Sequence, residues 1–391
     1  MNILIMHNAY RQVGGEDFAV SNEAELLANA GHRVTVETVD NRLIPTFAEM
    51  VRTARPRWWP MNLPRRAWMA EMLERLRIDI VHVHNFFPLL TPAVHAEAYA
   101  RGLPVIQTLH NYRLFCAAAT FERDGKVCEL CLHKSRLNAV RYRCYHDSAL
   151  SSAAVAAMQY QAVDRRLLTG NVDRFVALTE FARSKFVEGG LTPDRVLVKP
   201  NFLDRPRPPA ELPREGALFV GRISKEKGLR PLVEAWHRLP GISLTIIGDG
   251  PLRAELESGA PANVRFVGRI EREHVEEAMR RAAVLIMPSL WYEGLPMTLV
   301  EAFANGLPAI VSRLGSLAEI VDEGETGEFC APGDVQSIAD TVNRALADRA
   351  RLRRMGARAR EIFEEKYSPH RNLELLEAIY ADAMRLGSRP R

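Results

Sequence analysis

Short apolar runs alternate with longer segments of helical periodicity along almost the whole chain, and this alternation limits the fold more than any other feature. The apolar runs of the first half are 3–6, 34–37, 80–83, 105–108, 175–177 and 196–198. The helix-period segments between them are 16–30, 64–77, 91–100, 148–168 and 179–188. A strand that is apolar on both faces has to be covered on both sides, so this order predicts βαβ units and a parallel sheet.

The second half repeats the alternation after a proline-rich stretch. Its expected strands are 217–220, 243–247, 264–267, 284–287 and 309–311, and its expected helices are 228–238, 251–258, 273–281 and 297–305. Prolines stand at 200, 206, 208, 209 and 213; because proline fits neither a central strand nor a helix interior, they predict a linker. The expected fold class is therefore α/β, with two Rossmann-like, doubly wound parallel-sheet domains facing a central cleft.

Length and composition agree with two domains. The chain has 391 residues, of which 47% are hydrophobic, and this is enough for two cores. No apolar run approaches the roughly 18 residues that span a bilayer. The segment MNILIMHNAY has neither a charged n-region nor a cleavage site, so we expect a cytoplasmic protein. The net charge is +4, and residues 1–200 carry the basic excess, with 25 Lys and Arg against 20 Asp and Glu.

Residues 50–77 combine arginine with tryptophan. Seven arginines lie there with Trp58, Trp59 and Trp68, against only Glu71 and Glu74. Such a segment suits peripheral contact with the anionic inner face of a membrane, where indole rings lie at the level of the headgroups. A nucleic-acid surface and an ordinary solvated face with buried tryptophans are the alternatives.

Two features of the first half point to ligand contacts. Gly14-Gly15-Glu16 follows the first strand and opens a helix, which lets the backbone approach a ligand closely, although no GxGxxG pattern is present. His82 and His84 alternate along one strand and favour packing or local hydrogen bonds. His110 ends the next strand, where parallel sheets bind ligands, and favours a ligand contact.

Four of the five cysteines fall within 29 residues, at Cys116, Cys128, Cys131 and Cys144. In a reducing compartment such a cluster favours a structural zinc ion over disulfides, because four thiolates complete a tetrahedral site. The x11, x2, x12 spacing is not that of a standard zinc ribbon, so unliganded thiols and regulatory oxidation stay open. His133 or His146 could replace one ligand, and Cys330 stands alone as a structural residue.

The loop 221–228, GRISKEKG, directly follows an expected strand. Arg222 and Lys227 are five residues apart, so they can grip a diphosphate from one side. No Asp-x-Asp occurs in the chain, and we therefore expect these cations, rather than a carboxylate-held metal ion, to neutralise a diphosphate leaving group. A basic turn without a ligand is the alternative.

The stretch 291–312 predicts a loop, a short helix and a buried strand. Pro296 suits the first helical turn, and Gly306 with Pro308 supplies the stop signals. The N–H groups at the start of this helix could bind a phosphate or a sugar hydroxyl. Glu293 in the loop and Glu301 in the helix could each accept hydrogen bonds from a diol, on the wall opposite the cations of 221–228. A solvated helix with two surface acids is the alternative.

Taken together, these motifs resemble the retaining glycosyltransferases of family 4 (glycosyltransferase group 1), which have the GT-B fold, over nearly the full length. The resemblance is carried by Gly14-Gly15-Glu16, His110, the GRxxxxKG of 221–228, and the E-x7-E of Glu293 and Glu301 followed by AxxxGxP at 302–308. The run 109–144, with HNYRLFC and CELC, is similar to a subset with a cysteine-rich insertion. Many members of that subset serve cell-surface polysaccharide assembly.

The resemblance implies a role for each motif. Arg222 and Lys227 would bind the donor pyrophosphate, Glu301 the ribose, and Glu293 the transferred sugar, while His110 would contact that sugar near the reacting centre. The remaining donor-binding residues would be Gly15, Gly294, Leu295, Pro296 and Met297. Many members of the family carry Phe-Gly where this chain has Leu295-Pro296.

The resemblance also implies three parts. They are an acceptor-binding domain over 1–200 with the cysteine-rich segment 111–147, a donor domain over 201–369, and a helix over 370–391 that returns to the first domain. The expected reaction moves a sugar from a nucleotide diphosphate sugar to a glycan or lipid-linked glycan with retained configuration and no catalytic metal. A sugar-nucleotide epimerase of similar fold is the first alternative. A zinc-containing nucleic-acid binder ranks last, since it leaves the glycine loop and the two glutamates unexplained.

Overall fold

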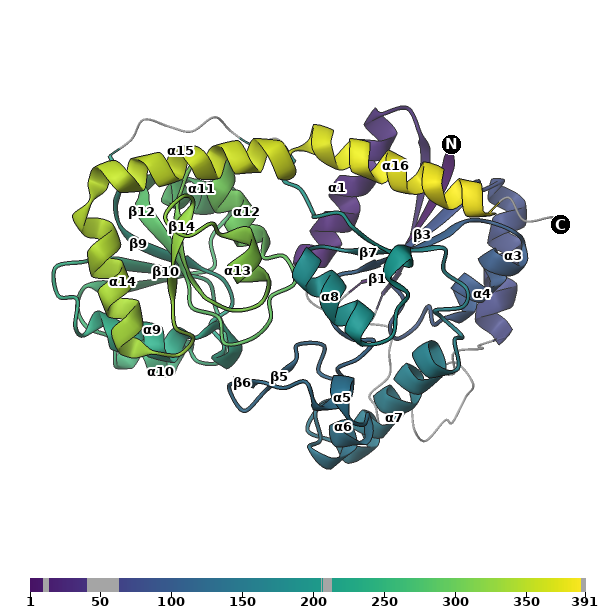
Figure 1. The fold of residues 1–391 in the computed structure, drawn as a ribbon, viewed down its shortest axis with the longest axis horizontal. Coiled ribbons are helices and arrows are strands. Elements are labelled where there is room, and N and C mark those ends of the chain that lie inside the picture. The colour runs from purple at the N-terminus through teal and green to yellow at the C-terminus, as the bar shows by residue number, and fades with distance from the viewer. Residues whose placement is uncertain (10–13, 41–62, 205, 207–212, 388–391) are drawn as a thin grey trace. The chain divides into compact units, whose positions relative to one another are not determined.

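The computed structural model describes residues 1–9, 14–40, 63–204, 206 and 213–387, and its chain divides into two compact units (Figure 1). The N-terminal unit contains Met1–Phe121, Glu129–Asn201 and Asn372–Arg391. The C-terminal unit contains Glu122–Cys128 and Phe202–Arg371. Most of the proline-rich segment 205–213 lies outside the described residues.

The N-terminal unit is built on a six-stranded sheet in the order β2-β1-β3-β4-β7-β8. Every neighbouring pair in this sheet is parallel. The strands are β1 (Asn2–Ala9), β2 (Arg33–Asp40), β3 (Ile80–Asn85), β4 (Val105–Leu109), β7 (Arg174–Ala177) and β8 (Val196–Val198). Each of the six apolar runs expected in this half lies inside one of these strands, so the prediction of a parallel sheet is confirmed.

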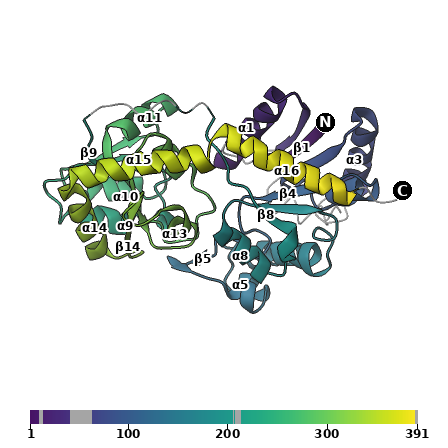
Figure 2. The same cartoon turned by 45° about the horizontal axis from the view of Figure 1, so that its top comes forward.

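Helices cover this sheet on both faces, as the apolar runs require. They are α1 (Gly15–Asn29), α3 (Leu63–Leu76), α4 (Ala93–Ala100), α8 (Glu180–Glu188) and α16 (Pro369–Gly387), whereas α7 (Ala149–Gln159) packs against residues 137–141. On one face α1 and α16 lie over the strands (Figure 2), where Leu27 and Leu376 join Ile3 and Ile80 in a single core. The helix expected over 148–168 is shorter, because α7 ends at Gln159 and continues as a π-helical turn, Tyr160–Asp164.

The cysteine-rich segment forms small elements. These are the antiparallel hairpin β5 (Glu122–Arg123) and β6 (Lys126–Val127), and the short helices α5 (Leu130–His133) and α6 (Leu137–Arg141). The hairpin groups with the C-terminal unit, whereas both short helices belong to the N-terminal unit.

The C-terminal unit has a second six-stranded parallel sheet, in the order β11-β10-β9-β12-β13-β14. Its strands are β9 (Glu215–Val220), β10 (Leu244–Ile247), β11 (Val264–Gly268), β12 (Ala282–Met287), β13 (Ala309–Ser312) and β14 (Gly327–Cys330). The first five coincide with expected strands, and β14 was not predicted. Its residue Glu328 is buried and pairs with Arg344 and Arg351, so the strand lacks an apolar run.

Helices flank the second sheet as well. They are α9 (Leu229–Trp236), α10 (Arg253–Ser258), α11 (Arg272–Arg281), α12 (Met297–Ala304), α13 (Ser316–Ile320), α14 (Val335–Ala347) and α15 (Arg349–Lys366). Side chains of α9 and α14, among them Trp236 and Val342, pack on Phe219, Ile246 and Ile286 of the strands. The indole N–H of Trp236 donates to the carbonyl of Ile242 at 2.9 Å, which satisfies the polar atom of this buried ring.

Helix α12 is held in place at its carboxyl end. Gly306 adopts φ 60°, and the N–H groups of Gly306 and Leu307 donate to the carbonyls of Phe303 and Ala302, which is a Schellman cap. Helix α15 packs closely against this end, since a Cβ built on Gly356 would lie 2.3 Å from the Gly306 carbonyl oxygen. The glycine therefore lets α15 support the cap of α12.

We predict that Gly356→Ala destabilises the C-terminal unit. Alanine in a helix is favoured over glycine by about 1 kcal/mol, but overpacking at a close backbone contact costs about 1–3 kcal/mol, so the clash decides the sign. The midpoint of thermal unfolding measures the effect. Gly241→Ala is the matched control because a Cβ there meets no atom within 4 Å. An unchanged or raised midpoint for Gly356→Ala would contradict the packing argument.

Candidate active site

The site of the C-terminal unit lies where the strand order reverses. Strand β9 lies between β10 and β12, so the chain leaves β9 toward one side and returns to β12 on the other. In open parallel sheets ligands bind beyond the carboxyl ends of the strands at such a point. The loops that begin there are 221–228 after β9 and 288–296 after β12, and they contain most of the predicted donor-binding residues.

Glycines let the backbones at this edge touch. Gly228 has φ 72°, and a Cβ on it would lie 1.9 Å from the carbonyl oxygen of Pro288, at the end of β12. A Cβ on Gly248 would lie 1.8 Å from the carbonyl oxygen of Gly221. A side chain at either position would push the loops apart. Gly228 at the end of the GRxxxxKG motif, and Gly248 beside Gly221, are thus needed for the shape of the edge.

Lys227 and Glu293 form an ion pair across these two loops. The Lys227 ammonium donates to Glu293 Oε1 at 2.8 Å, and the hydroxyl of Ser289 donates to the same oxygen at 2.6 Å. The ammonium also lies 5.3 Å from the centre of the Trp291 ring. The sequence predicted Lys227 and Glu293 on opposite walls of a diphosphate site, and in the structure the two side chains contact each other directly.

Arg222 differs from Lys227 in its surroundings. It is exposed at the start of the loop, and within the described part of the chain it has no ion-pair partner. Glu293, by contrast, is only 4% exposed. A ligand can therefore reach the Arg222 guanidinium without first breaking an ion pair.

The start of α12 has the form expected for an anion or hydroxyl site. Pro296 is the N-cap residue and lies just before the first helical turn, between the Glu293-Gly294-Leu295 loop and the helix. The helix itself begins at Met297, as predicted. The N–H groups of Met297 and Thr298 precede any helical carbonyl acceptor. Glu301 lies one turn further on, and burial raises the pKa of its carboxyl group, against the attraction of Arg272.

The N-terminal unit places Gly15 and His110 at the carboxyl edge of its own sheet. Gly14 is the N-cap of α1, and its N–H donates to Asp17 Oδ2 at 2.7 Å. Gly15 is exposed in the first turn of the helix. His110 follows β4 directly and is partly buried. Its Nε2 lies 2.9 Å from Nδ1 of His84 on β3, a contact that sequence reasoning missed although it recognised both histidines.

The structure does not gather the four clustered cysteines. None of the five is in a disulfide, and the Sγ atom of Cys116 accepts a hydrogen bond from the Phe121 N–H. Within the described residues, Glu23, His82 and His84 form the one group of at least three side chains that lie close enough to share a metal ion. This group contains no cysteine. Zinc at Cys116, Cys128, Cys131 and Cys144 stays a prediction, which elemental analysis of the purified protein tests.

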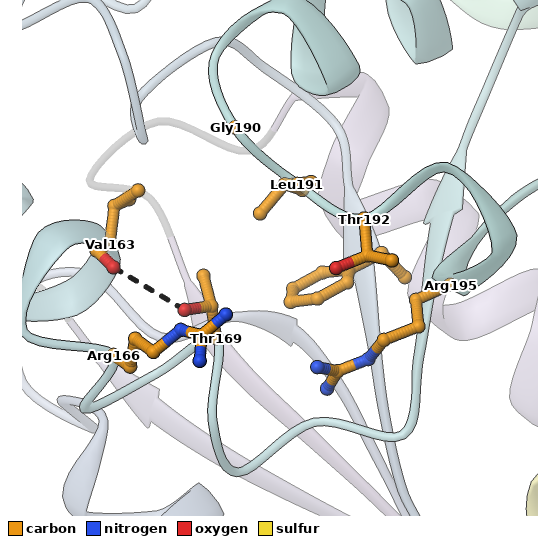
Figure 3. Close-up of a pocket in the computed structure, with 8 residues that line it drawn as sticks. Val163, Arg166, Thr169, Gly190, Leu191, Thr192 and Arg195 are labelled. Carbon is orange, nitrogen blue, oxygen red and sulfur yellow. Dashed lines mark hydrogen bonds between the residues drawn. The ribbon is translucent and has the colours of Figure 1, made fainter.

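A small pocket of the N-terminal unit lies apart from every predicted site residue (Figure 3). Its lining residues are Val163, Arg166, Thr169, Phe175, Gly190, Leu191, Thr192 and Arg195. Burial lowers the pKa of Arg195, whose guanidinium lies 5.8 Å from the centre of the Phe175 ring. No sequence motif pointed to this pocket.

The arginine- and tryptophan-rich segment is described only from residue 63 onward, so Trp58 and Trp59 lie outside the described residues. On α3, the Arg65 guanidinium stacks 4.6 Å from the centre of the Trp68 ring, and Arg66 pairs with Glu97. Among the residues that the structure describes, no helix is both long enough and apolar enough to cross a membrane.

Comparisons with known proteins agree with this architecture. The family model described as "Glycosyl transferases group 1" matches residues 203–362, and that described as "Glycosyl transferase 4-like domain" matches residues 14–201. A glycogen synthase of Mycobacterium tuberculosis is 28% identical over 92% of this chain and 90% of its own length. N-acetyl-alpha-D-glucosaminyl L-malate synthase of Bacillus anthracis is 24% identical over 98% of each chain.

Solved structures share the fold over almost the whole chain. A sucrose-phosphate synthase from Thermosynechococcus elongatus superposes with a TM-score of 0.70 at 19% identity, covering 98% of this chain and 99% of its own. The Anabaena protein HepE, in a complex with UDP, gives a TM-score of 0.69 at 15% identity, with 97% and 100% covered. The fold is thus GT-B, and the chain is an enzyme, a glycosyltransferase of group 1.

We predict that the N-terminal unit loses stability as the pH falls from 7 toward 4. Burial lowers the pKa of both His84 and His95 to about 4, from an ordinary value near 6.5. Below pH 6.5 the unfolded chain therefore binds protons that the folded chain does not, and each histidine removes up to about 3 kcal/mol by pH 4.

Unfolding midpoints measured across this pH range test the prediction. His95→Gln removes one of the two groups and should flatten the dependence, whereas His237→Gln, at an exposed histidine of the C-terminal unit, should leave it unchanged. A midpoint that is the same at pH 7 and pH 4.5 would show that the two histidines do not control stability.

Proposed function

We propose that this glycosyltransferase moves a sugar from a nucleotide diphosphate sugar to an acceptor hydroxyl with retention of the anomeric configuration. The observation that carries the proposal is the grouping of Arg222, Lys227 and Glu293 on the two loops beyond β9 and β12, at the strand-order reversal. Two cations beside a buried carboxylate suit a ligand that has both a diphosphate and sugar hydroxyls.

The diphosphate is the part of the donor that gains charge as the glycosidic bond breaks. Arg222 is accessible and carries a planar guanidinium, so it can bind two phosphate oxygens at once. Lys227 adds a second cation, which in the absence of ligand is neutralised by Glu293. A bound diphosphate would compete for Lys227 and let Glu293 turn toward the hydroxyls of the sugar.

The start of α12 supplies the other contacts. N–H groups of its first turn can donate to the sugar or to phosphate oxygens, and the Glu301 carboxyl group can bond the two ribose hydroxyls. A raised pKa makes the Glu301 carboxyl group easier to keep in its neutral form, in which it both donates and accepts. Gly294 and Leu295 shape the loop that leads into this turn.

No carboxylate in the first half of the sequence is an evident nucleophile, so we invoke no covalent intermediate for a retaining reaction. We expect the departing diphosphate oxygen to accept the proton of the attacking hydroxyl on the same face of the sugar. Arg222 and Lys227 then stabilise the charge that develops on that oxygen. His110 would contact the sugar near the reacting carbon.

The acceptor that we propose is a glycan or lipid-linked glycan of a cell-surface polysaccharide. The support is the similarity of 109–144 to enzymes with a cysteine-rich insertion, together with the basic segment 50–77. The described part of that segment contributes Arg65 and Trp68, stacked on the surface of α3, which suits peripheral contact with an anionic cytoplasmic leaflet.

Catalysis by this site should not need a bound divalent cation. Arg222 and Lys227 supply the positive charge that a carboxylate-held metal ion would otherwise bring to the diphosphate. We predict that transfer continues at an unchanged rate in excess EDTA once the protein has been purified with chelator. A rate that falls and returns on adding Mg²⁺ or Mn²⁺ would contradict this part of the proposal.

Arg222→Ala tests the diphosphate role. We predict that transfer slows by two to three powers of ten, because charge-stabilising donors contribute about 3–4 kcal/mol to a transition state. The unfolding midpoint should not change, since Arg222 is exposed. Arg265→Ala, at an exposed arginine of edge strand β11, is the matched control and should keep full activity. Near-normal turnover of Arg222→Ala would refute the assignment.

The assay first needs a donor. UDP-, GDP- and ADP-sugars can be screened by thermal shift, because a ligand that binds the folded state raises the unfolding midpoint. NMR of the product then shows whether the anomeric configuration is retained. Conversion of the donor without any acceptor would instead identify an epimerase.

A further inference from the structure

A chain of three buried or partly buried polar side chains leads from the interior of the N-terminal unit to His110. His84 Nδ1 lies 2.9 Å from His110 Nε2, and His84 Nε2 lies 3.1 Å from Glu23 Oε1. The two imidazole rings stack with centres 5.2 Å apart and an angle of 23° between their planes. Glu23 comes from α1, His84 from β3 and His110 from the end of β4, so three elements fix this geometry.

Glu23 is an anchored carboxylate. Its other oxygen, Oε2, accepts from the Lys199 ammonium at 2.7 Å, and Lys199 also donates to Asn372 Oδ1 at 3.1 Å. Both partners are almost fully buried, at 3% and 1% exposed. Burial by itself would raise the pKa of Glu23, but the attraction of Lys199, together with that of His84 and His82 and the hydrogen bond to His82, outweighs burial and holds the pKa well below its usual range.

The partners determine where the protons lie. A carboxylate can only accept, so Nε2 of His84 has to carry the proton that it shares with Glu23. Burial lowers the pKa of His84 to about 4, so the ring is neutral near pH 7 and its Nδ1 has a lone pair. That lone pair can only accept, and the hydrogen bond to His110 therefore requires a proton on His110 Nε2.

The Nδ1 atom of His110 is the ring nitrogen that can still accept a hydrogen bond. Burial, together with repulsion from His84, lowers the pKa of His110 well below 6.5, so its ring is also neutral. With Nε2 protonated, Nδ1 bears the remaining lone pair. Within the described residues this atom makes no hydrogen bond to the protein, and the partly exposed ring leaves it available to a ligand.

We propose that His84 and Glu23 are positioning residues that hold His110 as the Nε2–H tautomer, so that His110 offers Nδ1 as a hydrogen-bond acceptor to a substrate hydroxyl. That this hydroxyl belongs to the transferred sugar rests on the proposed function. A protonated imidazolium can only donate hydrogen bonds, so it would bind an acceptor atom of the ligand and not a hydroxyl proton. The arrangement therefore selects ligands that carry an O–H at this point.

A metal ion is the competing interpretation of the same residues. The ligand atoms of Glu23, His82 and His84 lie within 4.8 Å of one another. Lys199 already neutralises the carboxylate. His82 Nδ1 lies 2.9 Å from the Tyr380 hydroxyl and 3.1 Å from Glu23 Oε1, and His82 Nε2 lies 2.8 Å from the Thr108 hydroxyl. A divalent cation would lie beside a buried ammonium and would break these hydrogen bonds, so the polar chain fits the site better.

The tautomer can be read directly by ¹⁵N NMR of the full-length protein labelled at histidine, with His110→Gln used to assign the signals. We expect His110 to show a protonated Nε2 and an unprotonated Nδ1 at pH 7. His84→Phe removes the acceptor and should abolish this preference. His84→Asn keeps an oxygen near the Nδ1 position and should restore part of it. His95→Gln changes a buried histidine that contacts none of Glu23, His84 and His110, and it should leave the tautomer of His110 unchanged.

Transfer kinetics provide the second readout. We expect kcat to fall roughly 10- to 100-fold in His84→Phe, the range typical of groups that orient a functional histidine, with partial recovery in His84→Asn. A wild-type His110 that is protonated on Nδ1, an unchanged tautomer in His84→Phe, or a metal ion in the purified protein that is lost in His84→Phe would each overturn the proposal. Because the NMR result does not need a donor, it stands or falls independently of the transfer assay.

Discussion

Two ion pairs between lysine and glutamate, one in each unit, hold the polar side chains at the carboxyl ends of the strands. Lys227 binds Glu293 between the loops after β9 and β12, and Lys199 binds Glu23 between β8 and α1. Removing a charge from water is costly, and only a close partner with further hydrogen bonds offsets that cost. Each glutamate has such additional partners: Ser289 beside Glu293, and His84 beside Glu23. Changing one member would therefore disturb the whole local network.

The two pairs differ in how they relate to function. Lys199 and Glu23 are both buried, so their pair is permanent and orients the histidines. Lys227 is more exposed than Glu293, and a diphosphate can approach it from solvent. The first pair thus acts as a fixed support in our account. In the second pair a diphosphate can replace Glu293 as the partner of Lys227, because phosphate oxygens offer more negative charge than a single carboxylate.

Much of the fold could be predicted from the sequence, because buried parallel strands leave a simple pattern. Ten of the eleven expected runs fall inside strands of the two sheets, and the run 243–247 begins one residue before β10. Strand β14 was not predicted because it carries Glu328, whose charge is balanced by Arg344 and Arg351 from helices that follow it in the chain. The end of α7 was not predicted either, since the π-helical turn that follows it keeps a helix-like spacing of apolar residues.

Residues of the candidate site could be proposed from the sequence, but their contacts could not. Glycine loops and helix starts have local signals, so the roles of 221–228 and 291–312 could be proposed from spacing alone. The contact of Lys227 with Glu293 joins residues 66 positions apart, and that of His84 with His110 joins residues 26 apart. No local pattern encodes such pairs. The cysteine spacing suggested a common centre, but the described structure does not bring those four side chains together.

The most direct test of the account is a crystal structure of the protein with the nucleotide diphosphate that it binds best. We predict that the two phosphates contact Arg222 and Lys227, that the Lys227–Glu293 pair is broken or lengthened from 2.8 Å, and that the ribose lies against Glu301. A nucleotide bound elsewhere, or bound at this edge with its phosphates away from both cations, would contradict the central claim that these loops form the donor site.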